Sequence, residues 1–166
     1  MLKKIVTLAM AAVLAVSMVA CGNTAAKPTA TPEPVDLAAF GDQYVAAKQM
    51  PDQMDVSEGM GKDMLEMDYA GLSEIDTQQL VVYKSVMDVG GGEMLLVQTR
   101  NQDDVAKVKE IFQNHIDSKV SNQMDYPATI ELWTNNAEIV TNGNYVMLVA
   151  SAEKDSIVEA FNGLFA

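Results

Sequence analysis

Residues 137–151 read AEIVTNGNYVMLVAS and form two apolar, β-branched runs that meet at Asn142-Gly143. Asn-Gly between runs of this kind is the strongest short sequence pattern for a β-hairpin. The stretch that follows, residues 154–165, carries apolar residues at spacings of three and four, which predicts an amphipathic helix. The C-terminal part of the chain is therefore expected to fold as strand, turn, strand and helix.

The same order of elements occurs once more upstream. Apolar runs at 80–87 and 93–99 flank a run of glycines, which predicts a second hairpin. A long helix is expected over residues 102–124, with Asn101 as its N-cap. This helix carries a continuous apolar stripe made of Val105, Val108, Phe112, Ile116 and Val120.

Together these patterns predict an α+β fold. Two strand–turn–strand–helix units are expected to form a four-stranded, mainly antiparallel sheet with packed helices. One or two N-terminal helices, over residues 35–49 and 57–69, precede the first strand, and a short helix at 128–134 precedes the second hairpin. Because the strands carry apolar residues on both faces, either the N-terminal helices or a partner must cover the second face.

The first 21 residues are typical of a secretory signal. Lys3 and Lys4 supply the positive charge, and residues 5–16 form an uncharged, mostly apolar run. A small residue followed by Cys21 resembles the end of a bacterial lipoprotein signal, although Met18 stands where Leu is usual. The alternative interpretation is an ordinary secretory signal with an incidental cysteine.

Lipidation of Cys21, as predicted here, would divide the chain into three parts. Residues 1–20 are a signal peptide that is removed, residues 21–35 are the lipidated cysteine with a Pro-, Thr- and Ala-rich tether, and residues 36–166 are a single α+β domain. Two acyl chains supply the double anchor that stable membrane attachment requires. The protein is therefore expected on the extracytoplasmic face of the cell membrane, held through the lipid on Cys21.

Composition excludes several classes of function. The chain has 11 Lys plus Arg, 23 Asp plus Glu, and a formal charge of −12. This charge argues against nucleic acid as a partner, because nucleic-acid binding needs Lys and Arg against the phosphates. One Cys and one His exclude an intramolecular disulfide and the usual four-ligand structural zinc sites. No cofactor is expected, and the glycine run is no phosphate loop, because a strand follows it where a helix is needed.

Several stretches of the chain together form a family pattern. They are MLLVQTRNQDDVAKVKEIFQNHIDSKV at 94–120, Tyr126-Pro127-Ala128, Trp133, and AEIVTNGNYVMLVASAEKDSIVEAFNGLF at 137–165. With the N-terminal signal, this pattern resembles domain-of-unknown-function family 4358, which occurs in small lipoproteins of Gram-positive gut anaerobes. The resemblance implies a surface lipoprotein. It implies no activity and transfers no catalytic residue, because the family has none assigned.

Methionines are the first candidates for ligand chemistry. Met60, Met64 and Met67 lie at helical spacing in the second predicted helix, and thioethers are soft ligands that favour Cu(I). The sequence around them lacks the histidines that often accompany such ligands. The alternative is that these methionines fill an irregular apolar interface.

The titratable residues form no recognisable catalytic motif. His115, the only histidine, flanks the apolar stripe without an evident orienting carboxylate, so we expect a partly exposed helix histidine rather than a general base. The carboxylates at 52–68 lack the spacing of a calcium loop and are expected to form solvated acidic surface. No catalytic residue is assigned.

Three aromatic residues, Tyr126, Trp133 and Tyr145, lie near the ends of predicted elements. They either line a groove for a sugar or peptide, or pack in the core and at its edges. The sequence as a whole favours a membrane-anchored, non-enzymatic binding or interaction module with an envelope ligand or protein partner. Two alternatives stay open: an envelope hydrolase that uses Asp and Glu, and a Met-rich lipoprotein that handles Cu(I) or another metal.

Overall fold

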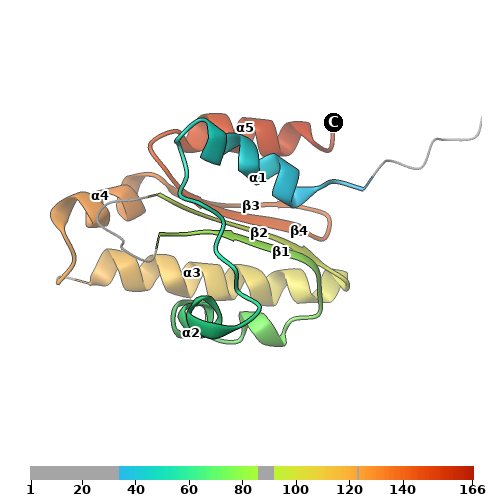
Figure 1. The fold of residues 1–166 in the computed structure, drawn as a ribbon, viewed down its shortest axis with the longest axis horizontal. Helices are drawn as coiled ribbons and strands as arrows, with labels where there is room; N and C mark the ends of the chain where they lie inside the picture. Colours follow the sequence, from blue (N-terminus) through green and yellow to red (C-terminus); the bar gives the residue numbers. More distant parts are fainter. Residues whose placement is uncertain (1–33, 86–91, 123) are drawn as a thin grey trace, which may run out of the picture. The chain divides into compact units, whose positions relative to one another are not determined.

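The computed structural model describes residues 34–85, 92–122 and 124–166 (Figure 1). Four strands form one antiparallel sheet in the order β1-β2-β4-β3, so the two hairpins meet along β2 and β4. The predicted α+β class is confirmed. The strands are β1 (Thr77–Tyr83), β2 (Glu93–Thr99), β3 (Ala137–Asn142) and β4 (Tyr145–Ala150).

The second hairpin turns one residue later than predicted. β3 continues through Asn142, which pairs with Tyr145, so the turn residues are Gly143 and Asn144. Gly143 has φ +56° whereas Asn144 does not have a positive φ, the combination found in a type II′ turn. Asn144 also ties the turn to the neighbouring strand, because its Nδ2 donates to the carbonyl oxygen of Thr99 at 2.6 Å.

One face of the sheet is covered by α1 (Leu37–Ala46) and α5 (Lys154–Gly163) (Figure 1). α1 begins at Asp36, whose side chain accepts a hydrogen bond from the backbone N–H of Ala39 at 3.0 Å. The buried side chains between these helices and the sheet include Leu37, Phe40, Tyr83, Met94, Met147 and Phe161.

Three helices cover the opposite face, and two short 3₁₀ turns lie next to them in the chain. These elements are α2 (Gly59–Asp68), η1 (Leu72–Glu74), η2 (Gln102–Asp104), α3 (Val105–Ser121) and α4 (Pro127–Asn135). A second group of buried side chains fills this side, including Leu65, Tyr69, Leu95, Phe112, Trp133 and Leu148. The predicted apolar stripe of α3 is buried at Val108 and Phe112 but exposed at Val120.

The long helix begins later than predicted. Residues 102–104 form η2, and Asp104 takes the N-cap position of α3. Asn101 does not cap the helix with its side chain, and its Nδ2 lies 3.4 Å from Asp104 Oδ2 instead. Asn101 instead takes the N-cap position of η2.

Helices of the chain itself cover both faces of the sheet. α3 and α5, which follow the two hairpins, lie on opposite faces, and each face receives one of the N-terminal helices as well (Figure 1). The open question of what covers the second face is thus answered without a partner. The predicted signal, Cys21 and most of the tether lie outside the described residues. Within residues 34–85, 92–122 and 124–166, the helices are too short or too polar to cross a membrane.

Candidate functional site

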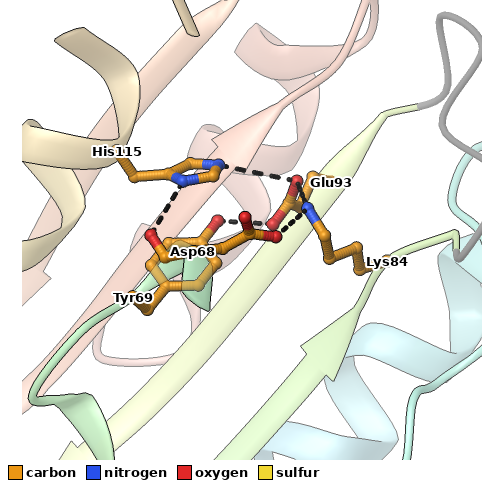
Figure 2. Close-up of polar contacts among 5 residues, drawn as sticks. All are labelled: Asp68, Tyr69, Lys84, Glu93 and His115. Carbon is orange, nitrogen blue, oxygen red and sulfur yellow. Dashed lines mark hydrogen bonds and ion pairs between the residues drawn. The ribbon is translucent and has the colours of Figure 1, made fainter. Parts of the chain in front are cut away.

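Five polar side chains meet at the end of the sheet where β1 stops and β2 starts (Figure 2). Asp68 and Tyr69 come from the C-terminal end of α2, Lys84 follows β1, Glu93 opens β2, and His115 lies on α3. We call these residues the polar cluster.

Strand alternation and helical periodicity explain why these side chains converge. Glu93 lies on the same face of β2 as Leu95, which belongs to the core beneath α3. Lys84 follows Val82 by two residues and so faces the same side. His115 comes three residues after Phe112 on α3 and therefore continues its buried stripe.

Glu93 is the centre of the polar cluster and only 2% of its surface is exposed. Its Oε2 lies 2.7 Å from the ammonium of Lys84, and its Oε1 accepts a hydrogen bond from the hydroxyl of Tyr69. Burial by itself would raise the pKa of Glu93, but the nearby His115 and Lys84 side chains lower that pKa to about 2. Glu93 is therefore ionised at neutral pH in spite of its burial.

Lys84 is shared between two carboxylates. Its Nζ lies 2.7 Å from Glu93 Oε2 and 3.2 Å from Asp68 Oδ2. Burial opposes the charge on Lys84, yet the two carboxylates raise the pKa of its ammonium above the ordinary value. Asp68 is the solvent-facing member of this pair of carboxylates, with 23% of its side chain exposed.

His115 is buried, with 5% exposure, so the expectation of a partly exposed histidine was wrong. Its Nδ1 lies 3.0 Å from the main-chain carbonyl oxygen of Asp68. Because a carbonyl only accepts hydrogen bonds, Nδ1 carries a proton and donates it there. Nε2 points toward Glu93 Oε2 at 3.8 Å and has no hydrogen-bond partner among the described residues (Figure 2). The ring also packs against Tyr69 and Trp133, with centroid distances of 4.2 and 5.0 Å.

The chemistry of the polar cluster is that of a buried electrostatic cross-link between α2, the sheet and α3. A general acid or base works best when its pKa lies near the working pH, and the pKa of Glu93 lies far below neutrality. A buried ion pair of this kind adds little net stability over well-packed apolar residues, but removing one partner strongly destabilises the fold, because the other charge is then buried and unpaired. The described residues contain no group of three or more His, Cys, Asp or Glu side chains placed to hold a metal ion.

The predicted methionine ligands all lie on α2. Met60 and Met67 are exposed on α2 and Met64 is half-buried, so the interpretation that they fill an apolar interface was wrong for the first two. The remaining members of the acidic stretch at 52–68 are largely exposed, as expected, but Asp68 is taken into the polar cluster.

The three predicted groove aromatics are not brought together. Trp133 is buried beneath α3, on one face of the sheet. Tyr145 lies on the other face, where its ring packs against Phe165 at a centroid distance of 4.9 Å. Tyr126 is exposed at the N-cap of α4.

A hollow of about 680 Å³ lies between α3, α4 and β3. Its apolar lining comes from Ile116 and Val120 on α3, Trp133 on α4 and Ile139 on β3. Charged side chains also border it, namely Lys109, Glu110 and Glu138. We call this hollow the β3 groove.

A family model described as a domain of unknown function, DUF4358, matches residues 48–151. The chain belongs to this family. The predicted membership is confirmed, and the DUF4358 segment contains the whole polar cluster and all three elements of the β3 groove. α1 and α5, which cover the other face of the sheet, lie outside that segment. Comparisons with curated proteins and with solved structures found no match.

The polar cluster was not predicted from the sequence, although two charged residues of the DUF4358 segment indicated that buried charges are present. Lys84 interrupts the apolar run LVVYKSVM at 80–87, and Glu93 is the first residue of the otherwise apolar run EMLLVQT at 93–99. A charge at an inward-facing strand position requires a buried partner of opposite sign. The identity of the partners was hidden because Asp68 and His115 are distant in sequence.

Proposed function

We propose that this chain is a lipid-anchored module on the extracytoplasmic face of a Gram-positive envelope, which binds an extended polypeptide segment along β3. The observation that carries the binding proposal is the position of β3 at the edge of the sheet, beside the β3 groove. An edge strand presents unpaired backbone groups, and an extended peptide can add to it as a further strand.

The two edges of the sheet differ. β1 is partly covered by the preceding segment, because Gln53 bridges to Tyr83 and the N–H of Met54 donates to the carbonyl of Val82 at 2.8 Å. β3 carries one charged residue, Glu138, and this side chain is held 3.1 Å from Lys154. The usual protection of an edge by several charges, Pro or a bulge is thus absent from β3.

The register of β3 indicates which backbone groups face outward. The N–H of Ser151 donates to the carbonyl of Asn136 at 3.0 Å, so Asn136 and every second residue after it point their backbone groups toward β4. Ile139 and Thr141 therefore direct their N–H and C=O groups to the free edge. The β3 groove lies beside them and offers apolar surface to alternate side chains of an added strand.

Replacing Thr141 with Pro is expected to weaken peptide binding at least tenfold, because Pro removes an outward N–H and leaves the β3–β4 hydrogen bonds in place. The probe is a set of peptides selected from a random phage-displayed library against the mature chain, with Kd measured by calorimetry. Thr141→Val is the matched control, because it keeps the N–H, and it is expected to bind like the wild type. Peptides that bind Thr141→Pro as tightly as the control, or a selection that yields no peptide, would refute binding at β3.

The anchoring proposal rests on the N-terminal sequence, which combines Lys3, Lys4, an apolar run and a small residue before Cys21. In a Gram-positive host grown with an alkyne-bearing fatty acid, the full chain is expected to incorporate the label. Cys21→Ser is expected to incorporate none, because the chain has no other cysteine to receive the lipid. Equal labelling of both chains, or an unlabelled wild type, would show that Cys21 is not the lipid site.

A further inference from the structure

α2 is attached to the rest of the domain through few side chains. Of its ten residues, only Leu65 is buried. Met60 and Met67 are exposed, and no side chain caps its N-terminus. Segments with few buried apolar contacts open locally at lower free energy than the core of a protein.

The C-terminal end of α2 supplies its polar attachment. The carboxylate of Asp68 lies 3.2 Å from the ammonium of Lys84, and the carbonyl of Asp68 accepts the hydrogen bond from His115. The next residue, Tyr69, is fully buried and packs on Phe112, so it stays anchored in the core. Opening of α2 therefore requires movement of the chain up to Asp68, whereas Tyr69 stays in place.

A left-handed glycine stands at the N-terminal end of α2. Gly59, its first residue, has φ +59°. Glycine reaches conformations of both signs of φ at little cost, so this end of α2 can change direction without steric strain. No other atoms lie within 4 Å of the position that a Cβ on Gly59 would occupy, which leaves space for rotation there.

Asp68 lines a hollow of about 220 Å³ together with Met67 and His115. Its carboxylate lies 3.2 Å from the ammonium of Lys84, and only 5% of the Lys84 side chain is exposed. Lys84 also lines a different hollow, of about 390 Å³, beside Pro51. Displacing the Asp68 carboxylate would therefore uncover the Lys84 ammonium on the side that faces Asp68.

We propose that α2 is a hinged cover over the polar cluster, and that its local opening, restrained by Asp68, exposes Lys84 to solvent. The closed state is favoured by the Asp68–Lys84 ion pair and by the burial of Leu65. In the open state Lys84 keeps Glu93 as its partner, so the buried charge stays balanced and the sheet remains folded. This cover is separate from the β3 edge, which lies at the opposite side of the sheet.

Asp68→Asn tests the proposal, because it keeps the size of the side chain and removes the charge that restrains the cover. Two rates are measured on the full mature chain: amide hydrogen exchange in residues 59–68, and acetylation of Lys84 by an activated acetate ester. Both rates are expected to rise roughly tenfold, which corresponds to a closed state that is about 1.4 kcal/mol less favourable. Amides of β2 and β4 are expected to keep their wild-type rates.

Asp63→Asn is the matched control, since Asp63 is an exposed acidic residue of the same helix. It is expected to change neither rate, and the exposed Lys62 is expected to be acetylated equally in all three proteins. Exchange in α2 that is as slow as in the sheet would overturn the proposal. So would an equal acceleration in α2 and the sheet in Asp68→Asn, because opening would then be global, or an unchanged rate at Lys84.

Discussion

Replacing Glu93 with Gln is expected to lower the free energy of unfolding by about 3 to 5 kcal/mol, the usual cost of breaking a buried ion pair by removing one partner. The variant leaves the buried ammonium of Lys84 with Asp68 alone and takes the charged acceptor from Tyr69. Urea denaturation at pH 7 measures the change. Glu138→Gln is the control, since Glu138 forms a more exposed ion pair with Lys154, and it is expected to cost less than about 1 kcal/mol.

The cost of Glu93→Gln is expected to depend on pH. The pKa of Glu93 is about 2 in the folded protein and 4.5 without the fold. A lowered pKa stabilises the fold above the unfolded pKa, and this contribution is lost as pH falls toward the folded pKa. The shift corresponds to about 3 kcal/mol, so the difference between wild type and variant is expected to shrink steadily from pH 5 to pH 2. A difference that stays constant over this range would show that Glu93 does not stabilise the fold through its charge.

Replacing Gly41 with Ala is expected to destabilise the protein by about 3 kcal/mol, at the upper end of the cost of overpacking a core. A Cβ at Gly41 would lie 2.1 Å from Cε2 of Tyr83 and 2.3 Å from its Cζ. The ring cannot move aside freely, because Tyr83 is fully buried and its hydroxyl lies 3.0 Å from the carbonyl of Ala38 and from Asp42 Oδ1. α1 must therefore lift from the sheet.

Gly163→Ala is the matched control for Gly41→Ala. Gly163 ends α5, and nothing lies within 4 Å of the position that its Cβ would take. Because Ala favours a helix over Gly, this substitution is expected to stabilise the protein by roughly 0.5 kcal/mol. The same change from Gly to Ala is thus expected to lower the free energy of unfolding in α1 and to raise it in α5, as measured by thermal and urea unfolding. A neutral Gly41→Ala would mean that α1 packs less closely on Tyr83 than the structure shows.

Much of the fold could be predicted from local patterns. The apolar runs of β2, β3 and β4 and the stripes of α3 and α5 predicted elements whose observed bounds differ by a few residues at most. The errors concern competition at element ends. At the second hairpin the preference of Gly143 for a positive φ moved the turn forward by one residue. Before α3, residues 102–104 form a 3₁₀ turn, so the α-helix begins at Val105.

Contacts between distant residues could not be predicted in the same way. Neither the burial of His115 nor the separation of Trp133 from Tyr145 on opposite faces follows from periodicity, because each depends on which helix covers which face of the sheet. The groove predicted from three aromatic residues required them to share a face. The β3 groove uses Trp133 together with side chains of α3 and β3 instead.

The amino-acid sequence alone was sufficient for the order and type of the helices and strands, the antiparallel sheet and the family, because these depend on neighbours a few residues apart. It also contains the N-terminal pattern that ends at Cys21, from which we predict a lipid anchor. Only the tertiary structure places Asp68, Lys84, Glu93 and His115 together and leaves β3 at the edge of the sheet. Those features depend on packing two hairpins and five helices around one sheet, where a charge is stable only if its partner from another segment arrives at the same place.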